Sequence, residues 1–176
     1  MKTKGFTLAE VLITLGIIGV TAALTLPSLI NMHQEASIGP KLAKAVATFE
    51  EAATRVMVEY PDLTLQEMYD KKDGTLVANL KKFIIISNEH LKDGTKVSLE
   101  EVQTQKSISE QAGKSVVKIV VDINGKGGLN TVGVDTFNLL LTNYGVVVPQ
   151  DCAAEIAKNG WVVDKNYSPA SCAPSN

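Results

Sequence analysis

The chain has 176 residues, of which 45% are hydrophobic and 20% are charged, and its formal net charge is -2. This composition excludes a largely disordered protein, because the hydrophobic fraction is high enough to bury a core. The body of the chain has no run of basic residues, so no nucleic-acid surface is indicated.

Hydrophobic residues are concentrated near the N-terminus. The 25 residues from Phe6 to Ile30 contain a single charged residue, Glu10. A helix of this length, with a rise of about 1.5 Å per residue, is long enough to cross a hydrocarbon core of roughly 30 Å. We therefore predict a membrane-spanning helix, with Lys2 and Lys4 held in the cytoplasm by the positive-inside rule and the remainder of the chain exported.

The order of features at the N-terminus differs from that of a secretory signal peptide. Such a signal has an apolar stretch of about 7 to 15 residues, followed by a cleavage site with small residues. Here the apolar run is longer and ends in Leu26-Pro27-Ser28 without such a site. An uncleaved signal anchor fits the hydropathy equally well and gives the same orientation.

The residues just before the apolar run separate these interpretations. Gly5-Phe6-Thr7-Leu8-Ala9-Glu10, followed directly by Val11-Leu12-Ile13, resembles the processing motif of type IV prepilins and type II secretion pseudopilins. The resemblance implies that a prepilin peptidase cuts after Gly5 on the cytoplasmic side and that the new N-terminal residue, Phe6, is methylated. It also implies that Glu10 pairs with the amine of a neighbouring subunit during assembly.

Glu10 also has a simpler explanation, because a carboxylate near the end of a spanning helix can reach the interface and favours the positive end of the helix dipole. A purely hydrophobic anchor gains nothing from it, however, since a charge at the centre of a span costs roughly 2.5 kcal/mol or more. Hydroxyl side chains on the same arc of the helix bond either to their own backbone carbonyls or to another helix. We favour packing between subunits; the stripe consists of Thr7, Thr14, Thr21, Thr25 and Ser28.

The helix is expected to continue beyond the apolar segment. Pro27 predicts a kink, and Gly39-Pro40 predicts a second break. Residues 31–60 form an amphipathic continuation that Pro61 ends, with one apolar face composed of Leu42, Val46, Phe49, Ala53, Val56 and Tyr60. A second helix is predicted from Leu76 to Leu91, whereas the polar residues 92–114 receive no assignment.

Residues with β-branched side chains dominate from Ser115 onwards. They predict three short antiparallel strands over 116–123, 137–142 and 146–148, the last two joined by a tight turn at Asn143-Tyr144-Gly145. A small sheet packed on the long helix gives an α+β fold, and the resemblance implies the same ladle-like fold. The predicted segments are a leader (1–5), a hydrophobic helix (6–30), its amphipathic continuation (31–60) and a globular head (61–176).

The segment 122–137 combines turn residues with oxygen ligands. It resembles the Asp-x-Asn-Gly loop, closing in Gly-x-Asp-x-Phe, of many pilin-like subunits, with Leu129 where that pattern has proline. Tight turns through positive φ are the simpler role for its Gly and Asn residues. The candidate calcium ligands are Asp122, Asn124 and Asp135, whose spacing is not that of an EF-hand. No cofactor is required, and calcium is the ion that the resemblance suggests.

The two cysteines, Cys152 and Cys172, are predicted to form one disulfide, because a lone close pair in an exported segment is typical of a structural bridge. Two free thiols in a cytoplasmic tail are the alternative. Trp161 lies between the cysteines and is expected to anchor packing.

The predicted function is structural: a subunit of a type IV pilus-like or type II secretion pseudopilus filament. Its partners are other pilin subunits, the prepilin peptidase and the assembly platform. It resides first in the bacterial cytoplasmic membrane and then in a periplasmic or extracellular filament. The alternative is a single-pass, membrane-anchored exported binding protein or enzyme that does not polymerise.

The two histidines, His33 and His90, stand in no metal or triad pattern, so no enzyme is predicted. The sequence does not separate a pilus from a secretion or DNA-uptake pseudopilus.

Co-expression with a prepilin peptidase is expected to remove residues 1–5. The motif lies on the cytoplasmic side of the predicted span, where such a peptidase acts, and intact-mass measurement would detect the cut. Replacing Gly5 with a bulky residue should block cleavage and leave membrane insertion unchanged. Mature protein that still begins at Met1, or that begins beyond Pro27, would contradict the prediction.

Overall fold

The computed structural model of the chain describes residues 5–84, 89–125, 130–164 and 167–172, without the side chains of residues 30–34. The chain divides into two compact units, residues 1–37 and 38–176, and each is described by itself. The described residues form one long helix, several short helices and a small antiparallel sheet, so the α+β fold predicted from the sequence is confirmed.

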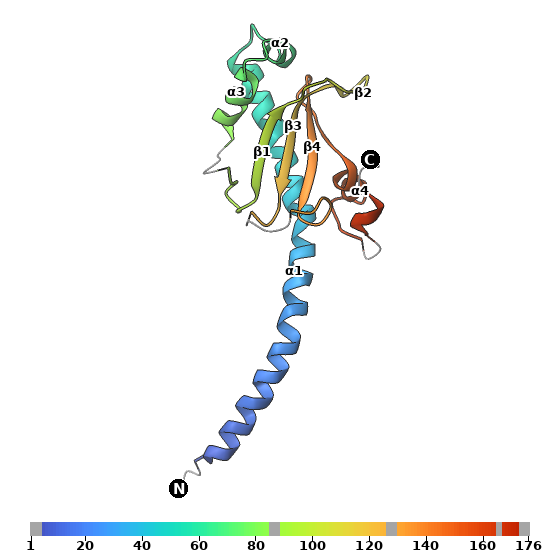
Figure 1. Ribbon diagram of the computed structural model, residues 1–176. Helices are drawn as coiled ribbons and strands as arrows, with labels where there is room; N and C mark the ends of the chain where they lie inside the picture. The colour runs from blue at the N-terminus through green and yellow to red at the C-terminus, as the bar shows by residue number, and fades with distance from the viewer. Residues whose placement is uncertain (1–4, 85–88, 126–129, 165–166, 173–176) are drawn as a thin grey trace. The chain divides into compact units, whose positions relative to one another are not determined.

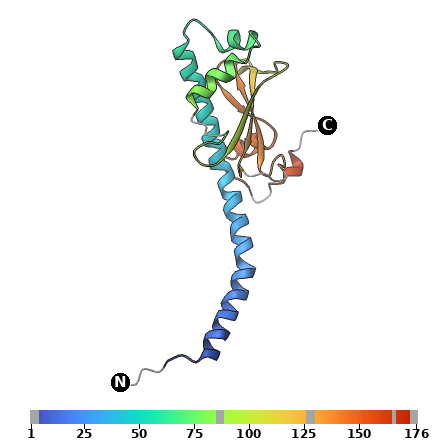
Figure 2. The ribbon, with the colours of Figure 1, turned by 60° about the vertical axis from the view of Figure 1, so that its left-hand side comes forward.

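Helix α1 runs from Leu8 to Glu59 (Figures 1 and 2). Neither Pro27 nor Pro40 ends it, so the predicted break at Gly39-Pro40 is wrong. A proline in a helix removes one backbone hydrogen bond, and the bonds of the flanking turns can maintain the helix. The C-terminal end of α1 is as predicted, because the helix stops just before Tyr60-Pro61.

The N-terminal part of α1 meets the requirements of a membrane span. Its apolar stretch covers Leu8–Leu29, and none of these 22 residues is buried. At about 1.5 Å per residue, this stretch is roughly 33 Å long, which matches the hydrocarbon thickness of a bilayer.

In the second unit, four strands form the continuous sheet order β1-β3-β4-β5, and β2 pairs separately with β3. All of the pairings are antiparallel, and Figure 1 shows β1, β3 and β4 side by side. The bounds are β1 Lys96–Glu101, β2 Ser107–Ser109, β3 Gly113–Asp122, β4 Thr136–Thr142 and β5 Val147–Pro149. The three predicted strands are confirmed as β3, β4 and β5, and Gly145, with a φ of 81°, forms the turn between the last two.

The register places apolar side chains in rows across the sheet. One row joins Leu99, Ile119 and Leu139, and a second joins Val97, Val121 and Phe137. All of these side chains are buried in one core with the apolar face of α1. That face is formed by Leu42, Ala45, Phe49, Ala52, Ala53 and Val56, whereas the predicted members Val46 and Tyr60 are only partly buried.

Two charged side chains of α1 bond to the sheet and its loops. The Lys41 Nζ donates to the backbone carbonyl of Ile123 at 2.9 Å. The backbone N–H of Val147 in the short edge strand β5 donates to Glu50 Oε1 at 3.1 Å. The carboxylate of Glu50 thereby covers a donor that an edge strand otherwise exposes.

Several connecting elements differ from the prediction or were not predicted. Helix α3 covers Thr75–Phe83 and ends there, so the predicted helix to Leu91 is too long. Leu91, the last residue of the predicted helix, lies instead in the connection to β1, where its N–H donates to the Thr95 carbonyl at 2.8 Å. The unassigned region 92–114 holds β1 and β2, and the short helices α2 (Leu65–Asp70) and α4 (Asp151–Lys158) were not predicted.

Gly39 is a close-approach position within the second unit. A Cβ built on Gly39 would lie 1.7 Å from the backbone oxygen of Trp161, a distance that no side chain tolerates. Trp161 itself has a φ of 64° and directs its carbonyl group against the helix. The absence of a side chain at Gly39 therefore allows the segment after α4 to lie against α1.

Replacing Gly39 with Ala should lower the free energy of unfolding by about 1–3 kcal/mol, because the new methyl group forces the backbone at Trp161 to move. Thermal unfolding of the full chain in detergent would measure the effect. Gly16→Ala is the matched control, since nothing lies within 4 Å of its Cβ position, and it should be neutral or slightly stabilising. Equal melting temperatures for Gly39→Ala and wild type would contradict this account of the contact.

Candidate functional site

The predicted cleavage site lies outside the helix. Gly5, Phe6 and Thr7 precede the first helical residue, Leu8, and all three are exposed. The side chain of Phe6 is 89% exposed. A peptidase requires an accessible, non-helical chain, and the bond between Gly5 and Phe6 meets both conditions.

Glu10 takes part in a capping box at the start of α1. The backbone N–H and the hydroxyl group of Thr7 both donate to Glu10 Oε2, each at 2.8 Å. The backbone N–H of Glu10 donates in return to the Thr7 hydroxyl oxygen at 3.3 Å. This reciprocal arrangement satisfies donors that the first turn of a helix leaves open. Within a single chain, Glu10 therefore has a structural role that needs no second subunit.

Three threonines of the polar stripe also form hydrogen bonds within the helix. The hydroxyl of Thr14 donates to the carbonyl of Glu10 at 2.9 Å, and that of Thr21 donates to the carbonyl of Ile17 at 2.9 Å. Thr25 makes the equivalent bond to Thr21, also at 2.9 Å. These bonds are the intrahelical alternative noted above, and they allow the threonines to face lipid at little cost.

The predicted calcium ligands act as hydrogen-bond partners within the loop between β3 and β4. Asp122 Oδ1 accepts from the backbone N–H groups of Asn124 and Gly125, at 3.2 and 3.1 Å. Asp135 accepts from the Thr131 N–H at 2.7 Å and from the Asn124 amide at 3.0 Å. Among the described residues, no three acidic, histidine or cysteine side chains gather as a metal site.

The hydrogen bonds of the described part of this loop support turn formation. Asp122 and Asp135 each accept from N–H donors of the loop, and the amide nitrogen of Asn124 faces Asp135. Positive φ values at Gly125 (60°) and Gly133 (86°) agree with the turn role predicted for its glycines. Leu129, which replaces the proline of the resembling pattern, lies outside the described residues.

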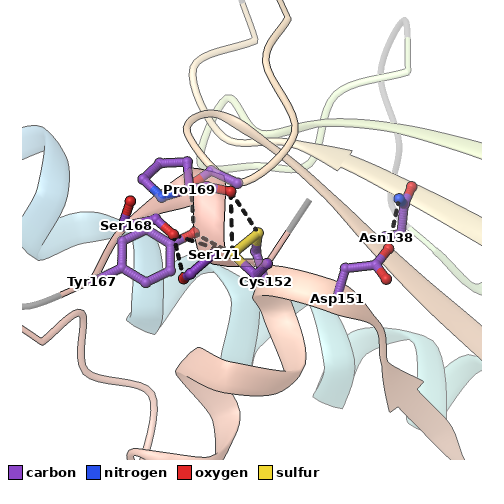
Figure 3. The surroundings of a disulfide bond; sticks show 9 residues. Asn138, Asp151, Cys152, Tyr167, Ser168, Pro169 and Ser171 are labelled. Atoms are coloured by element: carbon purple, nitrogen blue, oxygen red, sulfur yellow. Dashed lines mark hydrogen bonds between the residues drawn. A yellow bond between two sulfur atoms is a disulfide. The ribbon is translucent and has the colours of Figure 1, made fainter. Parts of the chain in front are cut away.

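Cys152 and Cys172 form a disulfide, as predicted, which links α4 to the segment after it (Figure 3). The bridge closes a separation of 20 residues. In the chain-entropy account, a loop of this size contributes about 3 kcal/mol to stability. The sulfur of Cys152 is nearly inaccessible, since the residue is 1% exposed.

The disulfide-linked segment after α4 contacts one end of the β3–β4 loop. The Tyr167 hydroxyl donates to the carbonyl of Gly133. A Cβ on Gly133 would lie 2.6 Å from the Cys152 sulfur, so only glycine fits between the disulfide and the loop. Burial, followed by the nearby charge of Glu155, raises the pKa of Tyr167 to about 12. The sequence pattern includes Gly133 as a turn glycine, but the contact of Gly133 with Tyr167 was not predicted because the two residues are distant along the chain.

A family model described as the prokaryotic N-terminal methylation motif matches residues 1–26. This motif is the signature of type IV pilins and pseudopilins, and it supports a pilin-like or pseudopilin precursor. It implies processing by a prepilin peptidase and assembly into pilus-like filaments, and it points to a structural protein. Together with the apolar helix, it fits a membrane-anchored precursor. No curated protein and no solved structure matches the chain.

Calcium is expected to bind the β3–β4 loop only weakly, if at all. A site with a Kd of about 1 mM would add only about 0.4 kcal/mol of stability at about 1 mM calcium. Melting temperatures with and without millimolar calcium would test this, with Asp135→Asn as control because asparagine retains an oxygen acceptor for the Thr131 N–H. An unchanged wild-type melting temperature would end the calcium hypothesis, whereas a large rise that Asp135→Asn abolishes would contradict weak binding.

Proposed function

We propose that the processed chain is a structural subunit of a type IV pilus-like or type II secretion pseudopilus filament. The observation that carries this proposal is a methylation motif over residues 1–26 that extends into a helix with no buried residue between Leu8 and Leu29. The precursor would cross the bacterial cytoplasmic membrane once, with residues 38–176 exported. The disulfide agrees with export, because such bonds persist in oxidising compartments.

The exposed apolar surface of α1 needs a non-aqueous environment at every stage. Leu12, Ile13 and Ile17 are each about 60% exposed, and the neighbouring apolar side chains are similar. Burying one such side chain is worth about 1.5–3 kcal/mol, so the helix does not remain in water. Lipid covers it in the precursor, and the helices of other copies replace lipid in the filament. The exchange is between two apolar environments, so helix packing and polar contacts drive it.

Glu10 is the proposed polar contact for assembly. Cleavage after Gly5 creates a positively charged α-amine on Phe6, and the carboxylate of Glu10 is the single charge in the predicted span. In one chain this carboxylate accepts from the neutral donors of Thr7. Exchanging them for the amine of a neighbouring subunit gives a charge-assisted bond, which is stronger in an apolar environment.

A second function is favoured by the capping box. Since Thr7 accounts for the Glu10 carboxylate within one chain, α1 can serve as a simple anchor. The protein would then be a single-pass, membrane-anchored exported binding protein that does not polymerise. Only the filament function requires the negative charge of Glu10, whereas both functions use its carboxylate oxygen as a hydrogen-bond acceptor.

Glu10→Gln separates these functions, because glutamine keeps the capping acceptor and removes the charge. In a host with the cognate assembly machine, this variant and Glu10→Leu should be processed normally and should yield roughly tenfold less polymer than wild type. Shear fractions and crosslinked ladders would measure the polymer. Thr7→Val is the control, since it weakens the cap but retains the charge, and it should assemble.

Normal ladders from both Glu10 variants would contradict the proposed contact and leave the filament function standing. If wild type itself forms no ladder in that host, the filament function is wrong.

A further inference from the structure

A groove of about 360 Å³ lies in the second unit, between α1, α3 and the turn at Leu91-Lys92. Its floor is apolar, with Ala52, Phe83 and Leu91 as lining residues. Its rim is basic, with four cationic side chains and one carboxylate, Glu51. The cations are Lys44, Arg55, Lys82 and Lys92.

Two of these cations already have carboxylate partners. Lys44 pairs with Asp93 at 3.0 Å, and Arg55 pairs with Glu51 at 2.6 Å. Lys82 instead donates to the neutral hydroxyl of Tyr60 at 2.6 Å, and its ammonium group lies 5.2 Å from the centre of that ring.

Lys92 is exposed and forms no ion pair with any described residue. Lys82 is also charged in the physiological range, and the hydrogen bond to Tyr60 raises its pKa further. Lys82 and Lys92 therefore give the groove a surplus of positive charge. A complementary ligand would combine carboxylates with an apolar group, because the basic rim surrounds an apolar floor.

The chain itself carries a segment of this chemistry, directly after the end of α1. No lysine or arginine occurs between Arg55 and Lys71, and this interval contains the carboxylates Glu59, Asp62, Glu67 and Asp70. Glu67 caps α2 through the Thr64 N–H at 2.7 Å, and Asp70 accepts from Gln66 at 2.9 Å.

Glu59 and Asp62 are exposed, and neither forms an ion pair with a described residue. Val58 beside them is 76% exposed, more than any other large hydrophobic residue described in the second unit. We define Val58–Asp62 as the acidic turn.

We propose that the groove binds the acidic turn of a second copy of this chain. Charge complementarity favours this occupant, and the inference rests on the proposed filament function, which brings copies together. The groove and the acidic turn adjoin within one chain, because the Tyr60 hydroxyl accepts from Lys82 and Glu59 contributes to the raised pKa of Lys82. Their residues are nevertheless different, and a groove-to-turn contact repeated from copy to copy is heterologous. Such contacts generate open helical polymers when the rotation does not close a ring. The contact should weaken with salt, because its charges are exposed.

Zero-length carbodiimide crosslinking of sheared polymer tests this contact directly. Full-length chains from isotopically light and heavy cultures are assembled together, so that mixed-isotope peptides report contacts between copies. We expect mixed-isotope crosslinks that join Lys82 or Lys92 to Glu59 or Asp62. Polymer whose mixed-isotope crosslinks lie elsewhere would overturn the proposal and leave the filament function standing. Crosslinks from these lysines to a different protein would overturn the second copy as occupant.

Charge reversal gives a second measurement. Lys92→Glu and Asp62→Lys should each lower the polymer yield roughly two- to fivefold, and the double variant should restore it. Lys118→Glu is the matched control, because Lys118 is an exposed lysine on β3 that does not line the groove, and its reversal should change nothing. Single variants that assemble as well as wild type, with normal melting temperatures, would also overturn the proposal. A wild type without polymer would overturn the filament function and this contact with it.

Discussion

The uncovered apolar surface of α1 between Leu8 and Leu29 is the constraint on which the other features depend. A helix satisfies its own backbone hydrogen bonds, so it is one of the few structures that can leave water for lipid. Thr14, Thr21 and Thr25 donate to carbonyls of the same helix, and the capping box satisfies two N–H donors at its start. Under the proposed filament function, assembly would therefore require an exchange of partners and no refolding of the helix.

The second unit combines one hydrophobic core with several specific contacts at its margins. The apolar face of α1 covers the buried rows of the sheet, and Lys41 and Glu50 bond to backbone groups at the margins of that contact. The disulfide, Tyr167 and Gly133 connect the tail to the β3–β4 loop. Gly39 admits the backbone of Trp161 against the helix. Glycine and a crosslink thus provide close contacts that side-chain packing alone does not supply.

The sequence predicted those features that depend on local patterns. The span followed from an uninterrupted apolar run, strands β3 to β5 followed from β-branched residues, and the disulfide followed from a lone cysteine pair. Strand β1 escaped prediction because Val97 and Leu99 are its only buried residues, between charged and polar neighbours. The extension of α3 to Leu91 was wrong because apolar periodicity does not show that Leu91 pairs with Thr95.

The candidate-site residues that lie in one local motif were predicted, whereas contacts formed only in the folded chain were not. Gly5, Phe6 and Glu10 were found because they are adjacent in a recognisable motif, but the cap that Thr7 provides for Glu10 was not considered. Gly39 was interpreted as a helix breaker, since only the folded chain brings Trp161 to it. The basic groove could not be predicted, because its lysines come from α1, α3 and the turn before β1.

The central claim is that copies of this chain replace lipid around the apolar segment of α1. A photocrosslinking amino acid at Val20, which is 63% exposed, would report directly what covers that surface. We predict lipid adducts when the chain is expressed alone, and crosslinks to a second copy when the peptidase and the assembly machine are also present. Lipid adducts alone under both conditions would contradict the claim.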